Sequence, residues 1–445
     1  MTLTAFSRGR DTRIATRLAT RFALTAAVGM GLFAAPAFAQ QQQELQPGWN
    51  FTVERIATGV NNGYQLAFDP QGRQVYFADT RWRTEARDED GNISVTQRAT
   101  GKLVQFDAET RAIAATYSYL GLSRSDGNGT EADAFDWDGI EATSLSSMRT
   151  QFSPYGVAVD YNDGDPLVIT TTARGRDEAF GYGGHVVVFN PSAGDPTDAD
   201  RIWQFEDGSP IFDGVRRVAV NTQTHKAFVT NFAEARAENG ERPGYVVVID
   251  LPTRTVEARV AIPEGGAIGV AVDEANNLVY VGTLTSDNLY VIDAGALDTS
   301  NAQDLELNAG AITELEAAVG ENARPTYNAD LQRLYVSAYA DPAGLITVVD
   351  ANPESDAYGT VIGTVETGPT NANEVDGERG LLYSANLGAR EVVVYDAETL
   401  EELLRLPTTG NALNIGIDPE TRDVWVSNFS QASVTDVFTL TYVDE

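Results

Sequence analysis

The stretch LVYVGTLTSDNLYVID, from Leu278 to Asp293, holds two short apolar runs on either side of a polar turn. Runs of this length, rich in Val, Leu and Tyr and bounded by Asn, Asp and Ser, are typical of paired β-strands. The preceding residues end another apolar run on Asp273, and Tyr280 follows seven positions later. This unit decides the fold, because it recurs along the chain.

The same seven-residue step from Asp or Asn to a large apolar residue occurs in seven places. The pairs are Asp69–Tyr76, Asp160–Leu167, Asn221–Phe228, Asp273–Tyr280, Asn328–Tyr335, Asp376–Tyr383 and Asp418–Trp425. Each is followed by a third apolar run, and most by a fourth, such as residues 255–262, 359–366 and 400–407. Four short strands cannot bury both sheet faces alone, so neighbouring units must stack. Radial stacking leaves only short edges, and we predict an all-β fold, a seven-bladed β-propeller of four-stranded antiparallel blades.

The seventh unit lacks a fourth strand of the usual pattern. Its missing strand has a candidate at the other end of the chain, because FTVERIATG (Phe51–Gly59) resembles the fourth strands of the other units. We predict that this N-terminal strand pairs into the last blade and closes the ring. Residues 51–445 then form a single domain, preceded by a short linker at residues 40–50.

The first 39 residues have the pattern of a cleavable signal peptide. Five Arg precede the apolar stretch 22–39, which ends in Ala37-Phe38-Ala39, a small-x-small cleavage site. We expect cleavage after Ala39 and a periplasmic or secreted protein. No stretch reaches the roughly 20 apolar residues of a membrane-spanning helix, so no membrane span is expected.

The composition is acidic and free of cysteine. Lys and Arg number 31, Asp and Glu number 64, and the formal net charge is −33. Without disulfides the core must hold by burial alone, which a chain of this length can manage. We expect a monomer that tolerates high ionic strength, because salt screens repulsion between like charges.

Extra chain is concentrated in the first three units, as insertions near residues 80–101, 119–153 and 173–184. In the strand order of other propellers these loops share one face, the top, and long loops on a rigid scaffold are where binding tends to be placed. The loops and the nearby strand starts are rich in Arg and aromatic residues. The candidate ligand- or partner-binding residues are Tyr64, Arg81, Trp82, Tyr155, Arg174, Arg216, Arg217, Phe232 and Arg324.

Arg and aromatic side chains together suit a small anionic or planar ligand, through bidentate hydrogen bonds and stacking. Two alternatives stay open. Each Arg could simply pair with a local carboxylate, and the insertions could be decoration without a ligand.

Several chemistries are disfavoured. The two histidines, His185 and His225, are expected at a third-strand start and in a turn on the opposite side, too far apart for a shared metal. No G-x-S-x-G elbow is present. The acidic stretches 88–92 and 126–141 lack the EF-hand order, so a hairpin turn and a solvated loop are favoured over calcium binding. We predict no catalytic residue, no metal and no cofactor.

The second strands carry a further pattern. FVTN at 228–231 resembles the YVTN-repeat propellers, as do YSAN at 383–386 and WVSN at 425–428. With the export signal, the chain looks most like the YncE-like periplasmic branch of that family. The resemblance implies a seven-bladed ring and export, and it raises single-stranded DNA binding as a property to test. From the residues themselves, Asn231, Asn386 and Asn428 directly follow strands and are predicted to cap turns.

The leading hypothesis is an exported, non-enzymatic binding or interaction propeller. Its partner is an unknown small anionic or planar ligand, or a protein, at the Arg- and aromatic-rich mouth. One alternative is a lactonase-like or quinoprotein-like enzyme, although the five tryptophans do not recur in register as a quinone site would favour. The other alternative, single-stranded DNA binding, is disfavoured by the net charge, which repels phosphates.

Overall fold

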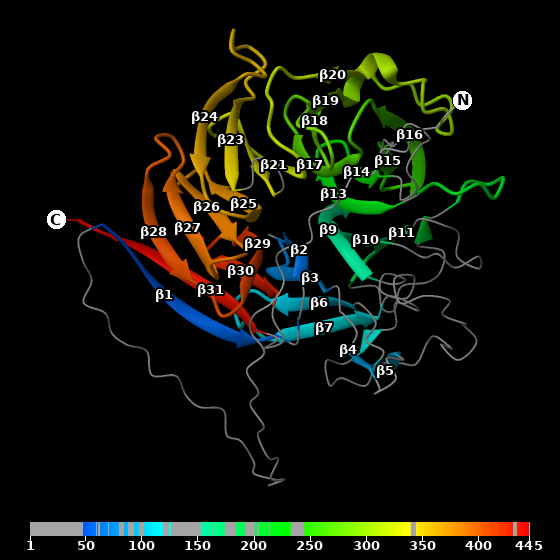
Figure 1. Ribbon diagram of the computed structural model, residues 1–445. Coiled ribbons are helices and arrows are strands. Elements are labelled where there is room, and N and C mark those ends of the chain that lie inside the picture. The colour runs from blue at the N-terminus through cyan, green and yellow to red at the C-terminus, as the bar shows by residue number, and fades with distance from the viewer. Residues whose placement is uncertain are drawn as a thin grey trace, which may run out of the picture. The chain divides into compact units, whose positions relative to one another are not determined.

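The computed structural model describes residues 48–58, 60, 63–69, 71–79, 84–87, 93–97, 102–118, 124–125, 153–162, 164–173, 184–191, 201–202, 204–212, 214–232, 244–339, 344–429 and 434–444. Their strands form seven antiparallel sheets around a central axis and one separate two-stranded hairpin (Figure 1). The fold is therefore a seven-bladed β-propeller of four-stranded blades, as predicted. The described residues also include the short 3-10 helices η3 (Ala294–Ala296) and η4 (Ala309–Ala311).

The first three blades follow the chain in order. Blade 1 consists of β2 (Gly63–Asp69), β3 (Gln74–Asp79), β6 (Lys102–Asp107) and β7 (Ile113–Ser118), with β8 (Arg124–Ser125) added at its edge. The hairpin of β4 (Thr84–Arg87) and β5 (Ile93–Gln97) falls between β3 and β6 in the chain. Blade 2 consists of β9 (Ser153–Asn162), β10 (Asp165–Ala173), β11 (His185–Phe189) and β12 (Arg201–Ile202). Blade 3 consists of β13 (Val215–Asn221), β14 (Lys226–Phe232), β15 (Gly244–Asp250) and β16 (Thr255–Ile262).

The remaining blades repeat the arrangement. Blade 4 consists of β17 (Ala267–Asp273), β18 (Leu278–Thr283), β19 (Leu289–Asp293) and β20 (Ile312–Glu314). Blade 5 consists of β21 (Ala323–Asn328), β22 (Arg333–Ala338), β23 (Leu345–Asp350) and β24 (Val361–Glu366). Blade 6 consists of β25 (Thr370–Asp376), β26 (Leu381–Asn386), β27 (Glu391–Asp396) and β28 (Glu402–Pro407). Blade 7 consists of β29 (Asn411–Ile417), β30 (Val424–Phe429), β31 (Val434–Val443) and β1 (Gly48–Ala57).

The N-terminal strand closes the ring, as predicted. β1 pairs with β31 along its whole length, from Gly48 opposite Val443 to Ala57 opposite Val434. Aromatic contacts reinforce the pairing, with the rings of Phe51 and Phe438 5.8 Å apart. The strand begins three residues earlier than predicted, inside the stretch expected to be linker.

In every blade except blade 2, the Asp or Asn near the end of the first strand caps the turn that follows. Asp418 Oδ1 accepts hydrogen bonds from the backbone N–H of Glu420, at 2.9 Å, and of Thr421, at 3.2 Å. The same carboxylate also accepts from Arg73 Nη1 of blade 1, at 2.6 Å. One side chain thus fixes a turn and joins two blades, which explains why the unit repeats an acid or amide at this position.

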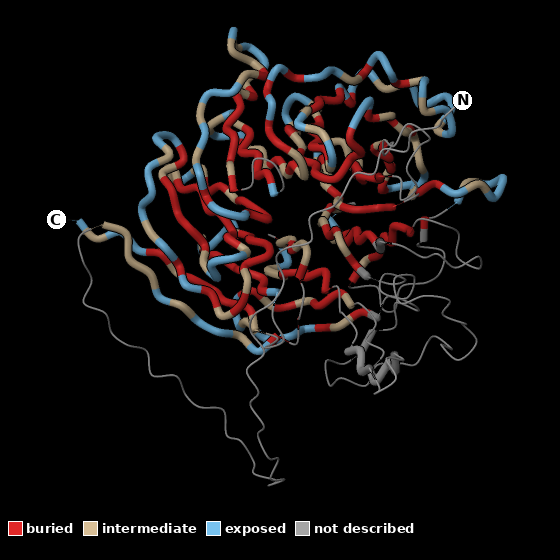
Figure 2. Tube along the Cα trace, viewed as in Figure 1, coloured by how far each residue is buried: buried red, intermediate tan, exposed pale blue. Residues whose placement is uncertain are grey.

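The large apolar residue of the repeat packs between blades. Tyr280, Tyr335, Tyr383 and Trp425 are fully buried, and the second and third strands carry most of the core (Figure 2). In blade 2 the seven-residue step identifies the wrong residue. In blade 4, for example, Tyr280 pairs with Ala271, which lies two residues before the closing Asp273. In blade 2, Leu167 pairs with the closing Asp160 itself, and Ile169 is the residue that pairs with Ala158, two residues before it. The β9–β10 hairpin is longer than its counterparts, which displaces the count by two.

Candidate functional site

The first strands of the seven blades surround the central channel. Each contacts the first strand of the next blade, and β2 contacts β29 where the ring closes. Six of the seven have a register irregularity near the start, at the mouth of the channel. In each of these six strands the irregularity, a β-bulge, contains the residue five positions before the closing Asp or Asn. These residues are Tyr64, Tyr155, Arg216, Ile268, Asn371 and Leu413. β-bulges redirect side chains and bend strands, so the repeat builds the mouth from displaced residues.

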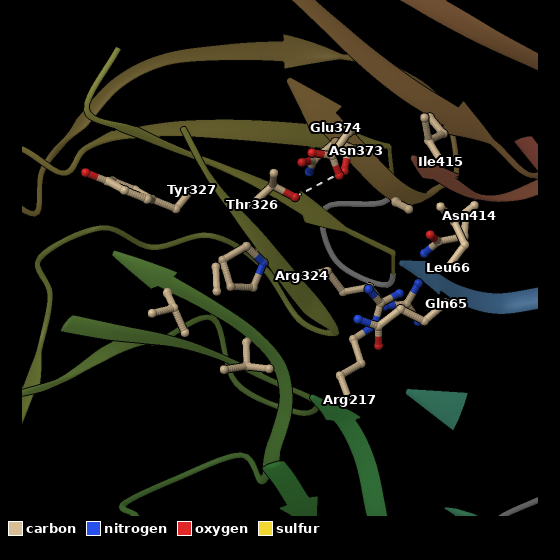
Figure 3. Close-up of a pocket in the computed structure, with 15 residues that line it drawn as sticks. Gln65, Leu66, Arg217, Arg324, Thr326, Tyr327, Asn373, Glu374, Asn414 and Ile415 are labelled. Carbon is tan, nitrogen blue, oxygen red and sulfur yellow. Dashed lines mark hydrogen bonds between the residues drawn. The ribbon is translucent and has the colours of Figure 1, made fainter. Parts of the chain in front are cut away.

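A cavity of about 210 Å³ lies within the channel, below these bulges. Its walls come from the first strands of blades 1, 3, 4, 5, 6 and 7 (Figure 3). Apolar side chains such as Val270 and Ile415 form part of the wall, and Gln65, Arg217 and Arg324 place polar groups into the same space. The three polar residues share one register position, each four residues before the Asp or Asn that closes its strand.

Arg324 is held by neutral partners. Its Nη1 donates to both the backbone and the side-chain oxygen of Asn371, and its Nη2 is 3.4 Å from Asn322 Oδ1. Asn371 is fixed in turn, because its Nδ2 donates to the carbonyl oxygen of Leu413 at 2.7 Å. The Nε of Arg324 is buried and has no hydrogen-bond partner among the described residues. Part of this guanidinium group is therefore oriented but unsatisfied.

Arg217 approaches from β13, on the far side of blade 4 from Arg324. Its backbone N–H donates to Thr230 Oγ1 at 3.0 Å, which anchors the main chain inside the bulge. Burial lowers the pKa of the Arg217 guanidinium and the positive charge of Arg324 lowers it further, while Tyr64 and Glu374 act in the opposite direction. Burial also lowers the pKa of Arg324. Two cations thus share the channel at an electrostatic cost.

Within the described parts of the chain, neither Arg217 nor Arg324 forms an ion pair with a carboxylate. Arginines elsewhere do: Arg73 pairs with Asp418 at 2.6 Å, and Arg405 pairs with Glu391 at 2.6 Å. Arg73 and Arg405 therefore fit the alternative in which each Arg forms an ion pair with a nearby carboxylate. That alternative does not account for the two channel arginines.

Four other predicted mouth residues form a row of ring–ring and cation–ring contacts. The rings of Tyr64 and Tyr155 lie 4.4 Å apart, and the Arg216 guanidinium is 4.9 Å from the Tyr155 ring and 4.0 Å from the Phe232 ring. Arg216 is 8% exposed and Phe232 is 4% exposed. The structure thus brings Tyr64, Tyr155, Arg216 and Phe232 together, but the last two fill the interface of blades 2 and 3 and support the mouth from behind.

Tyr64 faces the arginines as a neutral phenol. Burial and Tyr155 raise the pKa of its hydroxyl, while the charges of Arg324 and Arg216 lower it by less. The hydroxyl therefore keeps its proton at neutral pH. It adds a hydrogen-bonding group near the two channel arginines.

Sequence reasoning missed the deeper channel residues. Burial raises the pKa of Glu374 to about 7, although the Val375 backbone N–H and the Arg217 charge stabilise its ionised form. Neighbouring Asn373 is 4% exposed, and its amide has no hydrogen-bond partner within the described structure. The available signal was register: aligning the closing Asp and Asn residues would have placed these positions in the channel.

The remaining predicted site residues, Arg81, Trp82 and Arg174, lie outside the described residues. Most of the insertions near 80–101, 119–153 and 173–184 also lies outside the described residues, and so do the acidic stretches 88–92 and 126–141.

The predicted positions of the two histidines are confirmed. His185 begins β11, and His225 lies in the turn between β13 and β14, where its Nδ1 is 3.1 Å from Asp160 Oδ2. Of the three predicted turn caps, Asn386 ends β26 and its Oδ1 accepts from the backbone N–H of Ala389 at 3.3 Å, while Asn428 Nδ2 donates across the next turn to the carbonyl oxygen of Val434 at 3.0 Å. Asn231 and Asn428 lie inside β14 and β30, so the prediction that they directly follow strands is wrong.

Fold and channel together define the class of protein: a seven-bladed β-propeller with two arginines in its central channel that form no ion pair with any described residue. No family model matches the chain, and no curated protein matches it in sequence. Across the described residues, no helix is long and apolar enough to cross a membrane.

Proposed function

We propose that the protein is a non-enzymatic binding propeller whose channel holds a small anionic ligand between Arg217 and Arg324. One observation carries this proposal. In a chain of net charge −33, with 64 acidic residues, these two partly buried cations form no ion pair with a carboxylate among the described residues, and Glu374 in the same cavity acts on Arg217 only through its charge. An incoming anion supplies the missing negative charge.

The chemistry of the side chains supports an anion. A guanidinium group offers several N–H donors in fixed directions, and its hydrogen bonds to anionic oxygens are stronger than those between neutral groups. Both arginines extend from strands of a closed ring, so little order has to be imposed when the ligand binds. The cavity volume of about 210 Å³ limits the ligand to a small molecule.

We further infer that the chain is an exported relative of the YVTN-repeat propellers. The FVTN, YSAN and WVSN motifs, the seven-bladed fold and the signal-like first 39 residues support this inference. A DNA strand cannot enter a cavity of this size, so DNA binding in this chain would have to use the outer surface of the mouth. The channel arginines therefore favour the small anion over the polyanion.

The enzyme alternative makes a different demand on the channel. Glu374 is the carboxylate that lines the cavity, and acid–base hydrolysis of a lactone would make its side chain essential for turnover. Turnover of lactones by the wild type, lost in Glu374→Gln, would favour the lactonase-like alternative. We expect no turnover and unaltered ligand on recovery.

Isothermal titration calorimetry with small anions tests the binding proposal. The panel contains acetate, benzoate, phosphate and sulfate, titrated into the wild type, Arg217→Gln, Arg324→Gln and the control Arg405→Gln. Arg405 lies on the outer strand β28 and already pairs with Glu391 and Glu402. We expect each channel variant to lose roughly tenfold to a hundredfold in affinity, while the control is unchanged. Absence of binding for every anion, or equal binding by all four proteins, would contradict the proposal.

A further inference from the structure

We infer that the channel site selects a doubly charged tetrahedral oxyanion, a phosphate or sulfate group either free or at the end of a small molecule, over singly charged anions. The inference rests on the proposed function, because it names the ligand class of the same site. It is drawn from the number of cations, their positions around the channel and the donors they leave unused.

The first step is the balance of charge. Arg217 and Arg324 bring two positive charges to one cavity, without an ion-pair partner among the described residues. Glu374 lines the same cavity, and its pKa is raised to about 7. When Glu374 is protonated, a singly charged ligand neutralises one arginine and leaves the other uncompensated in surroundings that already disfavour the charge. A dianion neutralises both, and attraction between charges is stronger in a partly buried channel than in water.

The second step is direction. Arg217 comes from β13 of blade 3 and Arg324 from β21 of blade 5, so the two guanidinium groups reach the cavity from separate blades (Figure 3). A carboxylate has two oxygens in one plane. A tetrahedral oxyanion presents oxygens in several directions and can accept from both groups at once.

The third step concerns rigidity. Asn371 holds Arg324 Nη1 in place and leaves Nε buried without a partner within the described structure. Gln65 lines the same cavity as both arginines, and its Nε2 donates to the Val218 carbonyl oxygen at 3.1 Å. Donors fixed in this way match a compact, highly charged acceptor better than a diffuse one.

Glu374 supplies an internal check. Its carboxylate partly compensates Arg217 when ionised, and burial keeps its pKa near 7. The ionised Glu374 carboxylate repels a bound dianion and weakens its attraction to Arg217. We therefore expect Glu374→Gln to bind the dianion more tightly than the wild type does, at a pH where Glu374 is ionised.

Methyl phosphate and dimethyl phosphate form the matched probe pair. At pH 8 the first carries about two negative charges and the second carries one, on the same tetrahedral phosphorus. Sulfate and methanesulfonate form a second pair, which separates phosphate chemistry from sulfate chemistry. Affinities are measured by calorimetry for the wild type, Arg217→Gln, Arg324→Gln, Glu374→Gln and Arg405→Gln, with thermal melts to confirm folding.

We expect the doubly charged member of at least one pair to bind about tenfold or more tightly than its singly charged partner. Either arginine substitution should abolish that preference, and Glu374→Gln should increase it. Equal binding of both members in both pairs would overturn the inference while leaving the proposed anion site intact. Failure of every probe and every small anion to bind would overturn the proposed function as well.

Discussion

Arg216 and Arg217 are adjacent in the chain and have different surroundings. Both lie in the bulge of β13, opposite Thr230, so their side chains leave the strand in different directions. Arg216 is enclosed by the rings of Tyr155 and Phe232, whereas Arg217 enters the channel. Composition identified both as candidates, because Arg beside aromatic residues is visible in the sequence. The bulge directs Arg216 into the interface of blades 2 and 3 and Arg217 into the channel, and it is a property of strand pairing that the sequence does not show.

At the residue scale, Glu374 should make stability depend on pH. Its pKa is raised from 4.5 to about 7 in the folded protein, so between these values the folded state holds more protons than the unfolded state. Stability contributed by the protonated carboxyl is therefore present below pH 4.5 and is lost as the pH rises toward 7. Denaturant melts of wild type and Glu374→Gln across this range should converge at low pH and diverge in favour of the variant toward pH 7. A constant difference between the two proteins would contradict the shift.

At the element scale, the repeat predicted blades better than loops. The seven-residue step from Asp or Asn to a buried aromatic reflects a two-strand hairpin of constant length, and it failed in blade 2 because the β9–β10 hairpin is longer. The fourth strand of blade 5 begins at Val361 and that of blade 6 at Glu402, each two residues later than predicted. Channel positions followed from the same register, but recognising Asn373 and Glu374 required knowing that first strands surround the axis.

Removal of residues 40–59 should test ring closure. The deletion takes away β1 and leaves the outer edge of β31 unpaired, with Phe438 losing its contact with Phe51. We expect the melting temperature to fall by on the order of 10 °C and aggregation to increase, because an open strand edge pairs with other chains. A matched deletion within residues 40–45, before the strand, is the control. Identical melting of the two deletions would argue against closure by β1.

At the scale of the whole molecule, acidity and the channel have opposite effects on an anion. The net charge of −33 repels anions at long range, while two arginines attract them locally. Salt screens the first effect over about 10 Å at 0.1 M and acts less on partly buried groups. The fold protects the site from its own surface charge by placing the cations inside a closed ring.

The same charge predicts how stability responds to salt. Screening relieves repulsion among the 64 acidic residues, so the melting temperature should hold or rise as sodium chloride increases toward 1 M. Differential scanning calorimetry in a series of chloride concentrations measures this. A falling melting temperature at moderate chloride would show that ion pairs such as Arg73–Asp418 outweigh the repulsion.

DNA should bind weakly for the same reason. Nucleic-acid affinity comes largely from basic residues that displace counterions, and this chain has 31 basic against 64 acidic residues. We expect dissociation constants of roughly 10 µM or weaker near physiological salt, as for non-specific binders. Fluorescence anisotropy with a labelled oligonucleotide measures the affinity. Submicromolar binding that is lost in an Arg81→Ala/Arg174→Ala/Arg216→Ala variant would show that local arginines outweigh the net charge.

The most direct test of the central claim is a crystal of the protein soaked in selenate, a doubly charged tetrahedral oxyanion with an anomalous signal. The crystals are grown without phosphate or sulfate. If the channel binds such an anion, the wild type should show an anomalous peak within hydrogen-bonding distance of the guanidinium groups of Arg217 and Arg324. The Arg217→Gln/Arg324→Gln variant should show no such peak. A channel without selenate at saturating concentration, or a peak that persists in the double variant, would contradict the central claim.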